Sequence, residues 1–243
     1  MAIVGEIKVN ALMLRATDYR DNDKILTLLT AETGKISAGI KGVKKAGAKL
    51  KFAAQPFCFA EYVLAEKGGK YTVIQASEAE SFYELRSDIN KFYAACAVCE
   101  AACAVTYDSA ECYGVFRLCV DALTQMCNGD ECSALIRFLL CALDKSGYAV
   151  GLDNCTECGS PLLSADRMRF DMNSGSFTCW DCGDGAGVSG VTYNVLRLAS
   201  GRSYDGAYIT ADGRKRALKL LKEYFVFKTD AKLLSLSEYI RLI

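Results

Sequence analysis

Residues 25–40, with the sequence ILTLLTAETGKISAGI, decide how the first third of the chain folds. Two runs rich in apolar and β-branched residues, Ile25–Thr30 and Lys35–Ile40, flank the short segment Glu32–Gly34. The glycine of that segment supplies the backbone freedom that a tight turn needs, and two such runs around a turn are typical of a hairpin. The stretch therefore predicts two antiparallel strands.

Strand signals continue on both sides of this hairpin. Apolar residues recur with period-two spacing between Ile7 and Leu14, which predicts one strand before it. Two later runs, Phe57–Leu64 and Tyr71–Ala76, are joined by Glu66–Lys70, whose two glycines can take positive φ. Five strands in about 80 residues match a small Greek-key barrel of the OB type. We therefore expect an OB-fold nucleic-acid-binding domain over residues 1–80.

The hydrophobic period becomes helical after residue 80, and it is interrupted once by a cysteine-containing segment. We expect three amphipathic helices before the interruption and further helices after it, folding together as one bundle. The predicted fold class is α+β multidomain: an N-terminal OB-fold β-barrel, then an α-helical bundle (81–150 and 191–243) carrying an inserted four-cysteine zinc finger (151–190). The predicted helices cover Leu85–Cys103, Val115–Met126, Leu135–Leu143, Tyr193–Leu198, Arg214–Phe225 and Leu233–Ile240.

Composition excludes several classes of protein. Of the 243 residues, 51% are hydrophobic and 24% are charged, which is ordinary globular usage. The longest apolar runs, Ala94–Val98 and Ala101–Val105, are broken by Glu100 and fall far short of the ~20 residues that span a membrane. The N-terminus, beginning with Met1, lacks the basic start and apolar core of a signal peptide. We expect a soluble, cytoplasmic protein that does not bind membranes.

The chain has thirteen cysteines and no histidine. In a reducing compartment most cysteines are free thiols or metal ligands. The lack of histidine excludes His-based triads, His-ligated metal sites and the commonest general base near neutral pH. We therefore expect a protein without enzymatic activity.

Four of the cysteines form two matched units, CTECG at 155–159 and CWDCG at 179–183, with twenty residues between the second and third cysteine. Each unit brings two thiolates to one ion through a tight turn, and its glycine lets backbone amides point at sulfur without a Cβ clash. Four sulfurs close a tetrahedron with no position for water or substrate. We predict one structural zinc ion, held by Cys155, Cys158, Cys179 and Cys182.

Other interpretations of the cysteines stay open. The four could be buried apolar thiols, or thioredoxin-like redox pairs, although no βαβ pattern surrounds either pair. The remaining nine lie at apolar positions of helices or, for Cys58, of a strand. We predict that these nine are packing residues, because free cysteine behaves as a small hydrophobe.

Basic residues cluster near both ends of the chain although its net charge is zero. Six lysines and no acid lie between Lys35 and Lys51, interleaved with glycines. This pattern predicts a flexible cationic loop suited to phosphates, whose neutralisation releases counterions and makes binding salt-sensitive. A solvated loop that only keeps the chain soluble is the alternative. The candidate DNA-binding lysines are Lys41, Lys44, Lys45, Lys49 and Lys51.

A second basic cluster lies near the C-terminus. It comprises Arg214, Lys215, Arg216, Lys219 and Lys222, with Lys228 and Lys232 beyond it. Such a cluster is more often an exposed helix face than a binding surface. The apolar residues that follow are expected to dock the last helix onto the bundle; they are Leu233, Leu234, Leu236, Tyr239, Ile240 and Leu242.

Several stretches carry a resemblance to a known family. They are TDYRDNDKILTLLTAETGKI at 17–36, GIKGVKK at 39–45, QPF at 55–57, SFYELR at 81–86 and KLLS at 232–235. The chain resembles bacterial DNA repair proteins of the RecO family over nearly its whole length. Two departures are Asp21, where Glu is usual in that family, and Leu236, where a basic residue is common.

The resemblance implies an OB-fold domain and a helical domain with a zinc finger, without catalysis. Such proteins bind single- and double-stranded DNA, anneal complementary strands, and with RecR help RecA to displace single-stranded-DNA-binding protein. They also bind the acidic tail of that protein in an apolar pocket with a basic rim on the helical domain, for which Arg197, Lys215 and Arg216 are candidates. The resemblance adds Arg15, Arg20 and Lys24 as DNA-binding candidates, and it implies a nucleoid-associated protein of the bacterial cytoplasm.

The expected mechanism is electrostatic. Loop lysines would hold the backbones of two strands and lower their mutual repulsion, so that complementary bases pair. Phe52 and Phe57 are candidates for base stacking. The alternative function is a zinc-ribbon adaptor that binds only proteins, which would lack salt-dependent DNA affinity. A zinc hydrolase or redox enzyme would need an open metal position or a reactive thiolate.

Overall fold

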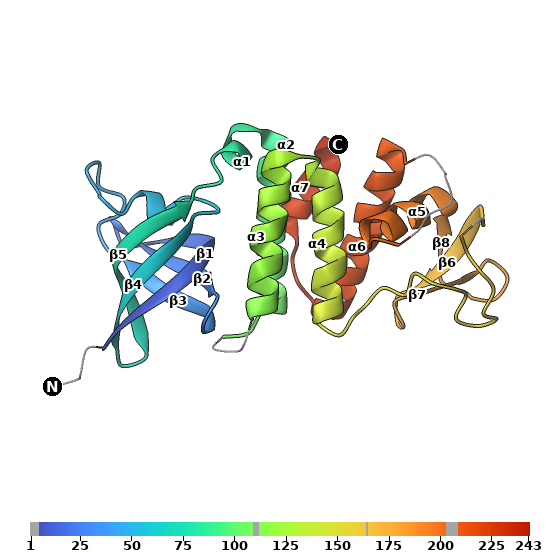
Figure 1. Ribbon diagram of the computed structural model, residues 1–243, viewed down its shortest axis with the longest axis horizontal. Coiled ribbons are helices and arrows are strands. Elements are labelled where there is room, and N and C mark those ends of the chain that lie inside the picture. Colours follow the sequence, from blue (N-terminus) through green and yellow to red (C-terminus); the bar gives the residue numbers. More distant parts are fainter. Residues whose placement is uncertain (1–4, 109–111, 164, 203–208) are drawn as a thin grey trace.

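The computed structural model describes residues 5–108, 112–163, 165–202 and 209–243. Figure 1 shows three parts in a row: a β-barrel, a helical bundle and a small module with its own β-sheet at the far end. Residues 1–4, on which the expectation of no signal peptide partly rests, lie outside the described ranges. None of the helices in those ranges is both long and apolar enough to cross a membrane.

Five strands close the N-terminal barrel in the order β1-β2-β3-β5-β4. Neighbouring strands are antiparallel except for β3 and β5, which pair in parallel. The hairpin predicted from residues 25–40 is formed by β2 and β3, with Thr30 opposite Gly34 at the turn. The predicted fold class, an OB-fold barrel followed by a helical bundle, is confirmed. The strands are β1 (Gly5–Tyr19), β2 (Asp23–Thr30), β3 (Gly34–Ile40), β4 (Phe59–Lys67) and β5 (Lys70–Glu80).

Strand β1 is longer than predicted because it is paired along both edges. Its first half pairs with β4 and its second half with β2, so that β1 closes the barrel. Alternate residues of the strand point to opposite sides. Val9, Ala11 and Met13 lie in the barrel core, whereas Leu12 and Leu14 belong to a core shared with the helices. The apolar run in the middle of β1 therefore reflects two buried faces.

The helices on both sides of the cysteine segment pack as one bundle, with α2 against α3, α4 and α7, and α4 against α5 and α6. Side chains of Asp88, Asp130, Ser189 and Thr210 cap the N-termini of α2, α4, α5 and α6. The helices are α1 (Glu84–Ser87), α2 (Ile89–Val105), α3 (Tyr113–Asn128), α4 (Glu131–Lys145), α5 (Gly190–Ala199), α6 (Ala211–Thr229) and α7 (Leu234–Leu242).

Three predictions about these helices need correction. The single helix expected over Leu85–Cys103 is divided into α1 and α2 at Asp88, whose backbone is extended and whose side chain caps α2. Helix α2 is not amphipathic, because it runs through the centre of the bundle and its buried residues, mostly alanine, are spread widely around its axis. Small side chains let the neighbouring helices and the barrel approach it closely. In the C-terminal segment, Leu236 and Tyr239 are buried as expected, but Leu234 and Leu242 are exposed and do not dock the helix.

The cysteine segment forms a separate module inserted between α4 and α5. Its sheet has the order β7-β6-β8, built from β6 (Arg167–Asp171), β7 (Ser176–Cys179) and β8 (Ala186–Ser189). Two aromatic pairs attach the module to the bundle: Phe177 against Tyr193 of α5, and Phe170 against Tyr224 of α6, with ring centroids 4.9 Å and 5.2 Å apart.

Lys35 joins the barrel to the bundle and does not extend the cationic loop. Its ammonium donates hydrogen bonds to the carbonyl oxygens of Cys103 at 3.0 Å and Thr106 at 2.7 Å. These carbonyls lie at the C-terminal end of α2, where backbone oxygens lack helical partners and a cation is favoured. Lys35 is therefore a structural residue, although sequence placed it at the start of the lysine run.

The substitution Lys35→Met is expected to lower the free energy of unfolding by about 1–3 kcal/mol, because two partly buried carbonyls lose their donor. Urea denaturation measures the change. Lys70→Met, at an exposed position of β5, is the matched control and should change stability by less than about 0.5 kcal/mol. Equal stability of the two variants would contradict a stabilising role for the contact with α2.

Candidate metal centre and candidate nucleic-acid interface

The four cysteines of the two matched units converge at one point of the inserted module. The sulfurs of Cys155, Cys158, Cys179 and Cys182 all lie within 4.8 Å of one another. The Cys158 and Cys179 sulfurs are 3.7 Å apart, close to the ~3.8 Å that a tetrahedron with Zn–S bonds of about 2.3 Å requires. The geometry can hold one metal ion with four thiolate ligands.

Backbone and hydroxyl groups around Cys155 and Cys158 lower the pKa of these two thiols and favour the charged form that binds metal. The amide of Cys179 donates to the Cys155 sulfur at 3.2 Å. Hydrogen bonding with the side chain and backbone of Ser160 lowers the pKa of Cys158 to about 6. Contact with the Cys158 sulfur in turn raises the pKa of Cys179 to about 11 and that of Cys182 to about 12. Because the thiolate is the metal-binding species, a cation at the centre of the four sulfurs would offset this opposition between neighbouring charges.

The glycine after each unit is required for a different reason. Gly159 has a φ of +74°, in the left-handed region that glycine adopts without strain. A Cβ on Gly183 would instead overlap the hydroxyl of Thr178. The predicted need for glycine therefore holds at both turns, through backbone conformation at one and close approach at the other.

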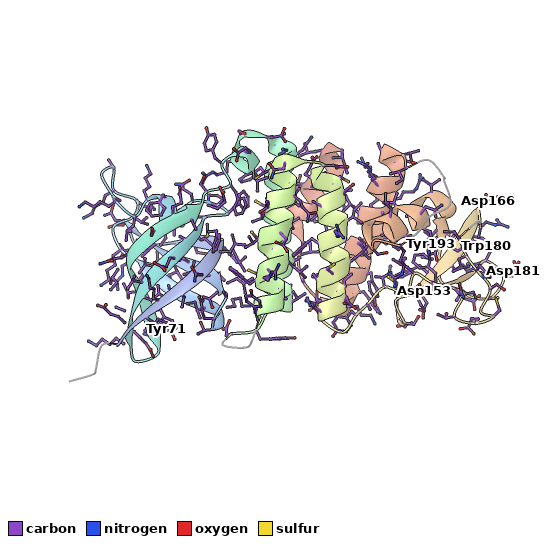
Figure 2. The ribbon with its side chains drawn as sticks, in the orientation of Figure 1. Tyr71, Asp153, Asp166, Trp180, Asp181 and Tyr193 are labelled. Carbon is purple, nitrogen blue, oxygen red and sulfur yellow. The ribbon has the colours of Figure 1, made fainter. Side chains whose placement is uncertain are left out.

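The surface of the module is mainly acidic, and its two arginines are engaged. Figure 2 shows Trp180 and Asp181 toward the outer end of the module and Tyr193 on the side of the helices. The guanidinium groups of Arg167 and Arg169 lie 4.3 Å and 4.2 Å from the centre of the Trp180 ring. Residues 151–190 contain six acidic residues against these two arginines. The module is thus poorly suited to bind phosphates.

The nine other cysteines are free thiols, five of them buried and four half-buried. Burial raises the pKa of Cys58 and of Cys132 to about 11, and it raises that of Cys99 well above its usual value. Such thiols stay neutral and unreactive at neutral pH. Two positions differ from the expectation, since Cys58 precedes β4 and Cys112 precedes α3 instead of lying within an element.

The loop after β3, residues 41–51, is a succession of turns held against the barrel. Val43 is buried and the amide of Gly42 donates to the Asp23 carboxylate at 2.8 Å. These anchors leave the polar side chains of the loop outside. All five predicted lysines are exposed: Lys41, Lys44, Lys45, Lys49 and Lys51.

Most of this loop's charge is uncompensated. Among the described residues, Lys44 is the one loop lysine with an acidic partner, Asp18, whose carboxylate it contacts at 3.0 Å. This hydrogen bond lowers the pKa of Asp18. The same carboxylate lies 3.7 Å from the ammonium of Lys24. The structure therefore brings Lys24 next to the loop.

The other candidates on the barrel differ in accessibility. Arg15 and Arg20 are exposed, with Arg20 placed over the Tyr19 ring at the tip of the β1–β2 hairpin. Phe57 is 2% exposed and packs edge-on against Phe92 of α2, so it is not available for base stacking. Phe52 is half-buried against the barrel core.

The C-terminal basic cluster is largely engaged within the bundle. Arg214 is paired with Asp130, Arg216 with Asp212, and Lys215 donates to the carbonyl oxygen of Ile243. Lys228 donates to the carbonyl oxygen of Asn173 and so ties α6 to the module. The alternative of an ordinary helix face is favoured for this cluster.

A pocket of about 450 Å³ opens between α3, α4 and α5. Its apolar wall includes Ile136, Val195 and Leu198, of which Leu198 is exposed, and its cations are Arg137 and Arg214. The three basic-rim candidates from the sequence do not line this pocket: they are Arg197, Lys215 and Arg216. No local pattern identifies Arg137, because it is separated in sequence from the residues that it faces.

The fold and the cysteine centre define a multidomain protein of the OB-fold class, with a cationic loop on its barrel and a module that can hold one metal ion. Models of two family domains match this chain: recombination protein O N terminal over residues 1–82, and recombination protein O C terminal over residues 86–237. The chain belongs to the RecO family of DNA repair proteins.

Individual relatives agree with this assignment. A DNA repair protein RecO from Clostridium perfringens (strain 13 / Type A) is 30% identical over 207 residues, which cover 83% of either chain. One from Anaeromyxobacter sp. (strain K) is 30% identical over 82% of this chain and 81% of its own. A third, from Heliobacterium modesticaldum (strain ATCC 51547 / Ice1), is 36% identical over 65% of this chain and 58% of its own.

Proposed function

We propose that this chain is a non-catalytic recombination mediator that binds and anneals single-stranded DNA. The observation that carries the proposal is the exposed row of lysines on the 41–51 loop, next to Lys24 and at one end of an OB-type barrel. OB barrels commonly bind single strands through a cationic groove that follows the backbone. Membership of a DNA repair family supports the same function.

Annealing follows from the same charges. Two complementary strands repel each other through their phosphates, and the repulsion extends about 10 Å at moderate salt. Lysines that contact both backbones lower this repulsion and hold the strands near each other while bases pair. Duplex DNA should bind through the same loop, since phosphate contacts do not depend on base sequence.

The partners proposed are those implied by the family. With RecR, the chain would help RecA to load onto DNA coated by single-stranded-DNA-binding protein. The pocket lined by Ile136 and Leu198 would accept the aromatic, acidic tail of that coating protein. Arg137 is exposed at this pocket and would pair with the carboxylates of that tail, whereas Arg214 already pairs with Asp130, which also lines the pocket.

The remaining features have structural roles in this proposal. We propose that the ion at the four cysteines is zinc, because a closed set of four thiolates is typical of structural zinc sites. We propose four segments: a DNA-binding domain over residues 1–80, the first part of the bundle over 81–150, the zinc module over 151–190, and the second part of the bundle over 191–243. The proposed location is the bacterial cytoplasm, in association with the nucleoid.

The test is single-stranded DNA binding as a function of salt. For single strands, the slope of log K against log salt is about −0.7 per phosphate contact. Replacing Lys41, Lys44 and Lys45 together with alanine is therefore expected to make the slope shallower by about 2. The measurement is fluorescence anisotropy of a labelled oligonucleotide, from low to moderate salt.

The control variant removes three other exposed lysines, Lys67, Lys70 and Lys219, and so makes the same change in net charge. It should keep the wild-type slope. An equal loss in both triple variants would mean that only total charge matters and would overturn the assignment to the loop. No binding by folded wild-type protein would instead favour a zinc-ribbon adaptor that binds proteins alone.

A further inference from the structure

A groove of about 740 Å³ lies between the barrel and the bundle. It lies apart from both the four-cysteine centre and the pocket on α4 and α5. Its walls come from β1, the start of β2, the segment before β4, helix α2 and the start of α7. The volume is within the range of about 300–1,000 Å³ that is usual for ligand sites.

The floor of the groove is apolar and uncharged. Leu14 and Pro56 line it from the barrel side, and Cys96, Cys103 and Ala104 line it from α2. Burial raises the pKa of both thiols, that of Cys96 to about 12, so neither sulfur carries charge at neutral pH. A flat, largely apolar group would replace water at this surface with a gain in free energy.

The rim of the groove is cationic. Arg15 and Lys24 stand on the barrel side and Lys232 on the bundle side. Glu100 is the one acidic residue among the described residues of the lining. It accepts hydrogen bonds from the backbone amide of Ser235 at 2.9 Å and from its hydroxyl at 2.8 Å. With both oxygens of that carboxylate engaged, the basic side chains of the rim favour an anionic ligand.

The groove is continuous with the lysine loop. Lys24 lines the groove and also lies 3.7 Å from Asp18, the carboxylate that Lys44 of the loop contacts at 3.0 Å. A chain of phosphates bound along the loop can therefore reach the groove past Lys24 and Arg15, and the Asp18 carboxylate between Lys44 and Lys24 is paired with both lysines. A backbone of this kind, with apolar flat groups attached, is single-stranded nucleic acid.

We infer that this interdomain groove holds an unstacked base of single-stranded DNA, with the flanking phosphates at Arg15, Lys24 and Lys232. The inference rests on the proposed function and assigns part of the site to the helical bundle. The guanidinium plane of Arg15 can stack on the base, as arginine does in many single-strand complexes. A duplex keeps its bases paired inside, so the groove selects single strands whereas the loop does not.

Two measurements on the full-length protein test the inference. The first is the salt dependence of oligo-dT binding for Lys232→Ala, which is expected to make the slope shallower by about 0.7 and to leave binding of a blunt duplex unchanged. Lys219→Ala, at an exposed position of α6 outside the groove, is the control and should match wild type.

The second measurement is photo-cross-linking with an oligonucleotide that contains 4-thiothymidine, followed by peptide mapping. Cross-links are expected within residues 96–104 or 231–235.

The outcomes separate the groove from the loop. In one outcome, the loop triple variant loses DNA affinity, Lys232→Ala binds DNA as Lys219→Ala does, and cross-links map to residues 41–51 alone. This result would overturn the groove assignment and leave the proposed function standing. If Lys232→Ala weakens capture of an acidic peptide but not of oligo-dT, the groove belongs to a protein partner and the inference is again overturned. Failure of wild-type protein to bind any DNA would overturn the proposed function and the groove assignment with it.

Discussion

Replacing Cys155 with serine is expected to release the metal ion and unfold the inserted module. Structural zinc sites contribute apparent binding free energies of about 10–16 kcal/mol, and much of this is folding free energy of the segment that holds the ion. Cys155 is the most buried of the four ligands, and its sulfur also accepts the amide of Cys179. The variant should contain far less than one equivalent of zinc by metal analysis.

A spectroscopic signal should accompany this loss. Trp180 is the one tryptophan of the chain and follows the ligand Cys179 directly, so its fluorescence reports on the metal centre. Chelation of the wild type should change this emission and lower the melting temperature. Cys141→Ser is the control, because Cys141 is a half-buried thiol of α4 outside the centre. The structural-zinc prediction would be contradicted by two results together. The wild-type protein would contain less than about a quarter of an equivalent of zinc, and chelator would leave its melting temperature unchanged.

The substitution Gly175→Ala is expected to destabilise the contact between the module and α6 by about 2–5 kcal/mol, the sum of backbone strain and overpacking. The residue has a φ of +72°, which favours glycine. A Cβ there would overlap the Tyr224 hydroxyl and lie 2.7 Å from the Tyr224 ring carbon Cζ and 3.0 Å from the carbonyl oxygen of Ala149. Tyr224 is 1% exposed, and its ring packs edge-on against Phe170 of the module.

The control for Gly175 is Gly147→Ala. Gly147 also has a positive φ, +81°, but no atom of the part of the chain that the structure describes lies within 4 Å of the position of its Cβ. This variant carries the backbone strain without the overlap and should lose about 1 kcal/mol. Thermal and urea denaturation compare the two. If both variants lost the same free energy, the packing of Tyr224 on Gly175 would contribute nothing.

Local patterns predict much of this structure because they reflect local causes. The hairpin of residues 25–40 and the helices α3 and α4 follow from residue spacing, and the four-cysteine centre follows from two turns of fixed geometry. The exposed lysines of the 41–51 loop were also predictable, since interleaved glycines and lysines seldom form a core.

The features that were missed depend on residues far apart in the chain. The partners of Lys35 lie 68 and 71 residues away. Phe57 packs on Phe92 of another domain and is 2% exposed, so its ring is not open for base stacking. Arg137 and the interdomain groove depend on how α2, α4 and α5 are placed, and no spacing along the sequence encodes that placement.

The core that β1 shares with the helices has a mechanical consequence. Leu12, Leu14 and Phe57 of the barrel belong to the same buried cluster as the interior of the bundle. An apolar interface of this kind resists sliding and hinge motion, unlike the polar contacts that usually separate domains. The barrel and the bundle should therefore tumble as one rod, with a constant distance between the lysine loop and the pocket beside Arg137. A DNA strand bound at the loop and a protein tail bound at the pocket would then be held at a fixed distance from each other. A force on the bound DNA would be transmitted through the rigid core to the bound protein tail, and the reverse.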